Sequence, residues 1–319
     1  TGLKKNLSLK GIETLDRNAW GFDRLLDFYR KNKYTATFFF LAKYMEGVHF
    51  RYRIGSRKIK QLLKQLKQDG HEIAFHPSRY AFDKPERYKK EKDKLEWTAK
   101  IKLSGLRHHY LRCLFPKIWE ICNRLGLKYD AGMIHRFYSG FRAGTCFPFP
   151  AFDHLNKKPI DIIEFPTTFF ENTLPEHGYD VEKSKKVIQE LLEKVKTHGG
   201  LFNILWHTNN IHQSDNYKYL WQYLTELIQN EDIFHKPLSE HYDWYQNRSK
   251  IKIDSIKKSE SGFIIHFDIP ENIKEFSLVV PSQYKYLSPS ELQYDIEKNK
   301  LIIKNENETG IILEAQTSE

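Results

Sequence analysis

The sequence lacks any long apolar segment and has few cysteines. No run of about 18 apolar residues occurs, so no membrane span is expected. No charged and then apolar leader precedes the first motifs, so no signal peptide is visible. The three cysteines, Cys113, Cys122 and Cys146, show no C-x-x-C spacing. That pattern argues against a disulfide scaffold and fits a reducing compartment, and we therefore expect a cytoplasmic protein.

A concentrated basic patch is missing from the sequence, although the net charge is +10. Lysines are spread over helix patterns such as 89–102 and 183–196, with glutamate and aspartate between them, which is typical of solvated helix faces. No nucleic-acid-binding module is recognisable, so no nucleic-acid partner is expected. An acidic glycan, a nucleotide-sugar or a lipid pyrophosphate would still profit from the positive field.

Apolar runs of strand length alternate with amphipathic helix patterns up to about residue 245. The runs 35–41, 72–75 and 160–166 are strand-like, and residues 58–69 and 181–196 have helical periodicity. This alternation is typical of β-α-β units and predicts an α/β fold with a parallel sheet or barrel.

The pattern changes after about residue 249. Short segments such as 251–256, 263–267 and 276–280 alternate with period two and are separated by turn residues. They predict a small antiparallel, sandwich-like β domain over residues 249–319. Its role is either structural or carbohydrate binding.

The most informative segment is Gly70-His71-Glu72-Ile73-Ala74-Phe75-His76-Pro77-Ser78. Gly70 ends a helix pattern, 72–75 is a buried strand pattern, and His76 follows at the strand end. In parallel α/β folds, catalytic groups collect at the carboxyl ends of strands. His76 is therefore a candidate metal ligand or proton carrier, with a polar loop cap as the alternative.

Further segments follow in a fixed order. They are a strand pattern at 7–13 ending in Glu13, A-T-F-F within 35–41, R-H-H-Y-L-R at 107–112, Y-D-A-G at 129–132, G-F-R-A-G-T at 140–145 and I-L-W-H at 204–207. Together with G-H-E-I-x-x-H at 70–76, this order resembles the polysaccharide deacetylases (NodB-homology domains) over residues 5–245. The resemblance implies a distorted, incomplete (β/α)7-type barrel, here over residues 1–248, and a divalent metal, with zinc as the expected ion.

The resemblance also implies site residues. His76 and Glu13 match metal-binding positions, and His109, or else His108, completes the set. If 107–110 is extended, His108 and His109 lie on opposite faces, and His109 shares its face with Arg107. Two positions depart from the family pattern, because Gly11 stands where an acidic base is expected and Tyr80 where a second histidine is common.

The remaining roles follow from the same resemblance. His207 is the expected general acid, Glu13 and Arg107 are further catalytic residues, and Arg107 corresponds to the arginine that orients the base. Arg142, Trp206 and Tyr80 are the expected substrate-binding residues. The alternatives are an ion pair of Arg142 with Asp130, a core position for Trp206, packing of His109 against Trp119, and a helix N-cap role for Glu13.

We therefore expect a metal-assisted hydrolase that removes N-acetyl or O-acetyl groups from a carbohydrate. One alternative is a deacetylase-like protein that has lost its base and binds glycan. The other is a barrel hydrolase of a different bond, such as a cyclic amide or a glycoside. A glycosidase needs two facing carboxylates, for which only Glu13 and either Asp130 or Glu164 are available.

Overall fold

The computed structural model describes residues 22–42, 52–208, 210–231 and 233–258, and further the stretches 262–271, 273, 275–279, 284–287, 293–295, 300–304 and 310–315. The chain divides into two compact units on either side of the Tyr242–Asp243 bond. The boundary expected at 248/249 falls inside helix α9 (Leu238–Lys250). The strand expected at 7–13, with Gly11 and Glu13, lies outside the described residues.

The first unit is an α/β structure with a parallel sheet, as the sequence predicts. Its main sheet has the strand order β1-β2-β3-β4-β6-β5, in which only β5 runs antiparallel to its neighbour, and β7 and β8 form a separate parallel pair. The strands are β1 (Thr37–Leu41), β2 (Glu72–His76), β3 (Gly105–Leu106), β4 (Tyr129–Asp130), β5 (Phe149–Asp153), β6 (Lys158–Glu164), β7 (Phe169–Phe170) and β8 (Ile204–Leu205). Among the described residues these strands leave the barrel open.

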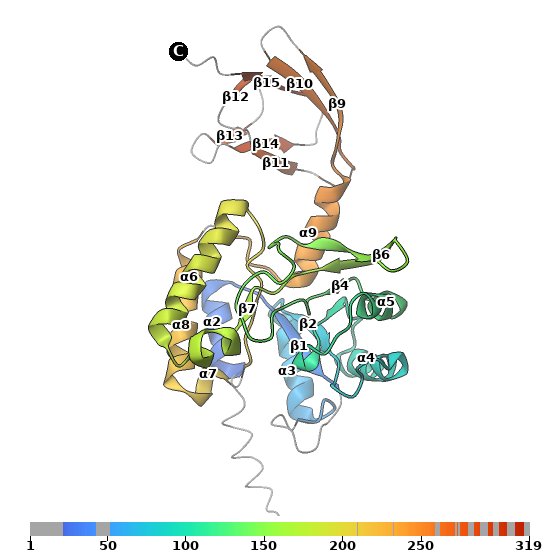
Figure 1. Ribbon diagram of the computed structural model, residues 1–319, viewed down its shortest axis with the longest axis vertical. Coiled ribbons are helices and arrows are strands. Elements are labelled where there is room, and N and C mark those ends of the chain that lie inside the picture. The colour runs from blue at the N-terminus through green and yellow to red at the C-terminus, as the bar shows by residue number, and fades with distance from the viewer. Residues whose placement is uncertain are drawn as a thin grey trace, which may run out of the picture. The chain divides into compact units, whose positions relative to one another are not determined.

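Helices cover both flanks of this unit. Helix α3 packs on β2, α4 on β1 and β2, and α5 on β4 and β6, while α6 packs on α8. In Figure 1, α4 and α5 lie on one flank and α2, α6 and α8 on the other. The helices are α2 (Phe22–Asn32), α3 (Arg57–Gln68), α4 (Pro85–Ala99), α5 (Lys117–Arg124), α6 (Val181–His198), α7 (Asn210–Gln213) and α8 (Asp215–Gln229), with 3-10 turns η1 (His109–Leu111), η2 (Glu171–Thr173) and η3 (Pro175–Gly178).

Helix α3 precedes β2, the strand that ends at His76, and its limits follow from the sequence. Ser56 caps its first turn by accepting a hydrogen bond from the amide of Ile59 at 3.4 Å. Its apolar side chains are buried at the spacing of one helical face, and they are Ile59, Leu62, Leu63 and Leu66. Gly70 then adopts a φ of +78°, which favours glycine, and the chain turns into β2.

The second unit is all-β after α9, with two antiparallel sheets in the orders β12-β15-β10-β9 and β11-β14-β13. Its strands are β9 (Lys252–Lys258), β10 (Gly262–Asp268), β11 (Glu275–Val279), β12 (Tyr284–Leu287), β13 (Gln293–Asp295), β14 (Lys300–Lys304) and β15 (Gly310–Ala315). The period-two segments of the sequence thus correspond to short antiparallel strands.

Candidate functional site

His76 ends β2, and its ring is held by the neighbouring strand. The ring Nδ1 lies 2.6 Å from the backbone oxygen of Arg107. Because a carbonyl oxygen only accepts, Nδ1 carries the proton and Nε2 is the nitrogen with a free lone pair. Burial, followed by the charge of His109, holds the pKa of His76 well below its ordinary value. The imidazole is therefore neutral at neutral pH, as metal ligation requires.

His109 lies beside His76, with ring centroids 5.0 Å apart. Its Nδ1 is buried and has no hydrogen-bond partner among the described residues. Burial, followed by the charge of His207, lowers the pKa of His109 to about 4. Its ring contacts Tyr110 at 4.3 Å between centroids. Trp119 donates its indole N–H to Glu164, and its ring contacts in the described part of the chain are with Phe115 and Phe149 rather than with His109.

The condition under which the faces of His108 and His109 were assigned, an extended segment 107–110, is met only as far as His108. From His109 the chain forms the 3-10 turn η1, in which Tyr110 and Leu111 have φ values of 58° and 53°. His108 and His109 nevertheless point apart. His108 is buried, with Nδ1 3.4 Å from the hydroxyl of Tyr88 and Nε2 3.4 Å from Oδ1 of Asp130. His109 is therefore the histidine that joins His76.

These two histidines fit a divalent metal. A ligating histidine commonly donates its other ring N–H to a backbone carbonyl, which is the arrangement of His76. The buried and unpartnered Nδ1 of His109 is the kind of atom that a ligand satisfies. No group of three potential ligands occurs among the described residues, and Glu13, the expected third ligand, lies outside them.

Arg107, which follows β3, forms hydrogen bonds with residues next to three other strands. It is buried and donates to the backbone oxygen of Ala131 at 3.0 Å, to the hydroxyl of Thr167 at 3.0 Å and to the side-chain oxygen of Asn203 at 3.2 Å. Its guanidinium lies 4.6 Å from the ring centre of Phe39. Burial lowers its pKa to about 10, so it stays charged at neutral pH.

His207 lies just after β8 and pairs with a buried carboxylate. Its Nδ1 lies 2.5 Å from Oε1 of Glu171, which also accepts from the His207 amide at 3.0 Å and from Asn210 at 2.5 Å. Burial acts to lower the pKa of His207, but the charge and hydrogen bond of Glu171 outweigh it, and the pKa is raised. The charge of His207 contributes to the low pKa values of both His76 and His109, so the three imidazoles are close enough to interact.

The three expected substrate-binding residues lie in different surroundings. Tyr80 is exposed, with the guanidinium of Arg79 over its ring at 4.9 Å. Arg142 donates to the backbone oxygen of Ile134 at 3.0 Å, and Asp130 is fully buried elsewhere, so an ion pair between Arg142 and Asp130 is wrong. Trp206 is partly buried, with its ring 5.3 Å from Trp221, which favours the core alternative.

Sequence reasoning missed Glu171, Asn203 and Asn210. The available signal was the position of Glu171, which directly follows the apolar pair Phe169–Phe170 at a strand end.

The carboxylates considered for a glycosidase, Asp130 and Glu164, are both fully buried. Burial, followed by the charge of Asp130, raises the pKa of Glu164 well above its ordinary value. These two carboxylates therefore belong to the interior and do not flank a substrate.

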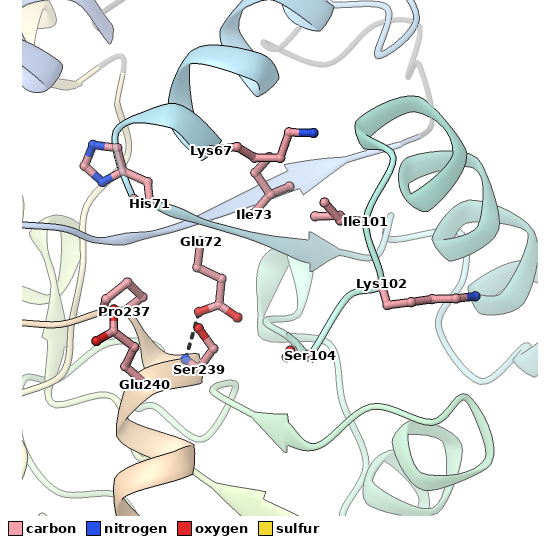
Figure 2. A pocket seen from close by; sticks show the side chains of 11 residues that line it. Lys67, His71, Glu72, Ile73, Ile101, Lys102, Ser104, Pro237, Ser239 and Glu240 are labelled. Carbon is pink, nitrogen blue, oxygen red and sulfur yellow. Dashed lines mark hydrogen bonds between the residues drawn. The ribbon is translucent and has the colours of Figure 1, made fainter.

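A cavity of about 250 Å³ lies elsewhere, at the amino-terminal ends of β2 and β3. Figure 2 shows Glu72 between β2 and α9, accepting from the Ser239 amide at 3.0 Å. The Glu72 carboxylate also accepts from the hydroxyls of Thr37 and Tyr129, each at 2.8 Å. Protein groups therefore already satisfy this carboxylate, and the cavity lies at the edge of the sheet opposite to His76.

Comparisons with known proteins concern the fold and the first part of the chain. The family model described as polysaccharide deacetylase matches residues 16–114. Two solved structures share the fold, each described as a candidate polysaccharide deacetylase. The one from Mycobacterium smegmatis is 14% identical, with 76% of this chain and 82% of that chain covered and a TM-score of 0.54. The one from Pseudomonas aeruginosa PAO1 is 15% identical, with 75% and 78% covered and a TM-score of 0.55.

A search of curated protein sequences gives no match. No helix in the described part of the chain is long and apolar enough to cross a membrane. The family model covers the segment that carries β2, His76 and His109, and the similar structures extend the shared fold over three quarters of the chain. On these findings, residues 16–114 are similar to the polysaccharide deacetylase family, and the chain shares its fold with two solved structures described as candidate polysaccharide deacetylases.

Proposed function

We propose that this protein is a metal-assisted hydrolase that removes acetyl groups from a carbohydrate. The observation that carries the proposal is the pairing of His207 with the buried Glu171, together with the adjacent rings of His76 and His109. Hydrolysis of an amide needs an activated water, stabilisation of an oxyanion and an acid for the leaving amine. A divalent ion supplies the first two when it is bound.

Side chains of the protein would bind the ion and supply the proton for the leaving group. His76 and His109 would hold the ion, together with Glu13 as the expected third ligand. His207 keeps its Nδ1 proton on Glu171 and uses Nε2 to deliver a proton to the leaving nitrogen. Glu171 fixes the ring orientation and stabilises the protonated imidazole, in the way a buried carboxylate supports a catalytic histidine.

The test compares His207→Ala with wild type on an N-acetylglucosamine oligomer, with acetate release as the readout and bound metal measured by elemental analysis. Loss of a general acid is expected to lower the rate about 10²- to 10⁴-fold. Metal content is expected to stay unchanged. An unchanged rate would discard the acid role, and joint loss of metal and activity would make His207 a ligand.

The alternative of a glycan-binding protein without activity rests on Gly11, which replaces the expected base. If wild type supplied with metal hydrolyses no acetylated sugar, Gly11→Asp is the decisive variant. Activity gained by Gly11→Asp would identify a chain that has lost its base. Continued inactivity together with measurable glycan binding would favour the binding role.

A further inference from the structure

The loops that surround the histidines carry a strong positive charge. Segments 77–84, 107–116 and 131–148 follow β2, β3 and β4 and therefore stand at the carboxyl edge of the sheet. They contain five arginines and one lysine but a single carboxylate, Asp83. The one acidic group shown beside the histidines, Glu171, is fully buried and already bound to His207. Little negative charge in these loops offsets the arginines.

Two of these arginines are held in place by aromatic rings of one turn. The guanidinium of Arg79 lies 4.9 Å from the ring centre of Tyr80, and its Nη2 donates to the Tyr80 hydroxyl at 3.0 Å. The guanidinium of Arg112, from the next loop, lies 4.6 Å from the ring centre of Phe82. Stacking fixes the plane of a guanidinium and leaves N–H groups at its edge for bidentate contact with an anion.

Helix α4 holds the turn at residues 78–82 through hydrogen bonds. Arg87 of α4 donates to the backbone oxygen of Tyr80 at 3.0 Å. The buried Glu91 of α4 accepts from the amide of Ser78 at 2.8 Å and from its hydroxyl at 2.6 Å. The turn that carries Arg79, and that presents the Phe82 ring to Arg112, is therefore held in place, which lowers the conformational entropy lost when the arginines bind a ligand.

Both arginines lie close to the histidine pair in the chain. Arg79 is the third residue after His76, and Arg112 is the third residue after His109. No ion pair includes Arg79 or Arg112 within the described residues, whereas Arg30 and Arg124 on the helices pair with carboxylates.

We propose that the substrate carries an anionic group, either a sugar carboxylate or a phosphate, next to its acetylated sugar, and that Arg79 and Arg112 bind this group. The proposal deepens the proposed function and rests on the same site. Charge-assisted contacts of this kind raise the affinity for the charged ligand about tenfold or more above the affinity for its neutral analogue.

The experiment compares two tetrasaccharides, one of alternating glucuronate and N-acetylglucosamine and one of N-acetylglucosamine alone. Binding is measured by calorimetry and deacetylation by acetate release, for wild type, the double variant Arg79→Gln/Arg112→Gln, and the control Arg124→Gln from the far end of α5. N-acetylglucosamine 1-phosphate against N-acetylglucosamine forms a separate arm, in which preference for the phosphate identifies phosphate as the anion.

Wild type and Arg124→Gln are expected to bind at least one anionic ligand about tenfold more tightly than its neutral counterpart. That preference should weaken as ionic strength rises from about 0.01 M to about 0.15 M, because the Debye length falls from about 30 Å to about 8 Å. The double variant should lose the preference and keep its affinity for the neutral oligomer.

Equal binding of charged and neutral ligands by wild type would overturn the inference, even if the neutral oligomer is deacetylated and the proposed function stands. Preferential binding of the charged ligand without hydrolysis of either oligomer would support the inference and count against the proposed function. A double variant that loses affinity for both ligands equally would also overturn it, because the arginines would then act only on the turn.

Discussion

At the level of single residues, burial and neighbouring charges shift the pKa values of the histidines in opposite directions. The backbone oxygen of Arg107 holds the ring of His76, while burial and neighbouring charges keep its pKa low. The carboxylate of Glu171 raises the pKa of His207 against the effect of burial. The pKa shifts of His76 and His109 favour the neutral imidazole that metal ligation needs, whereas the shift of His207 favours the protonated form that a general acid needs.

Glu171→Gln is expected to change the pH dependence of the reaction. A general acid works in its protonated form, so the rate falls as pH rises through the raised pKa of His207. Glutamine keeps an oxygen for the three N–H donors but removes the negative charge, so burial then lowers the pKa unopposed. We expect the basic limb of the kcat profile to move to lower pH by about one unit or more.

The matched control is Glu176→Gln, an exposed carboxylate five residues further along the chain. Its pH–rate profile should coincide with that of wild type. A Glu171→Gln profile that also coincides with wild type would show that His207 does not supply the proton.

The histidines were predictable because each follows an apolar strand pattern, as His76 follows 72–75 and His207 follows 201–206. His109 was also preferred over His108, but on the condition of an extended segment, whereas the chain turns at Tyr110 and Leu111 with positive φ angles. Such conformations are uncommon for these residues and persist only when the surroundings impose them. Glu171 was missed because one carboxylate in a loop has no spacing pattern.

At the level of elements, helix α4 presents buried acidic groups to two different loops. Glu91 accepts two hydrogen bonds from Ser78, two residues after His76. Glu96, one turn further on, accepts from Lys92 at 2.8 Å and from the amide of Leu103 at 3.0 Å, ahead of β3. The same helix therefore anchors the loop at the site and a loop at the other end of the sheet.

Glu91→Ala and Glu96→Ala are expected to separate these two roles. Each leaves a buried amide without its acceptor, so each should lower the free energy of unfolding by about 1–3 kcal/mol in a denaturant titration. Only Glu91→Ala should also weaken metal binding, by about 10-fold or more, as loss of a group that supports ligands does. Equal metal affinity in the two variants would show that the Ser78 anchor does not position His76.

The lengths of the strands could not be predicted from the apolar runs in the sequence. The apolar run 201–206 predicts a strand of six residues, yet only Ile204–Leu205 pairs, with Phe169–Phe170 of β7. An apolar run reports burial, whereas strand length depends on how long a neighbour stays in register. Elements such as α3, α6 and α8 agree with the sequence within a few residues because their periodicity arises within the helix itself.

At the level of the whole molecule, the start of α9 belongs to the α/β unit. The amide of Leu238 donates to the hydroxyl of Thr37 at 2.8 Å, and the amide of Ser239 donates to the carboxylate of Glu72 at 3.0 Å. Burial raises the pKa of Glu72, so this carboxylate depends on its hydrogen bonds. The α/β unit therefore needs the first turn of α9, while the strands β9 to β15 belong to the other unit.

A chain of residues 1–250, which keeps all of α9, is therefore expected to fold by itself and to melt cooperatively, since a domain carries its own core. The matched comparison is a chain of residues 1–236, which removes the donors supplied by Leu238 and Ser239. Because Glu72 then loses a backbone partner while buried, the shorter chain should be less stable by about 1–3 kcal/mol in urea. Circular dichroism melts and urea titrations of both chains provide the measurement. An insoluble or non-cooperative 1–250 chain would contradict the independence of the α/β unit, and equal stability of the two chains would show that α9 contributes nothing to it.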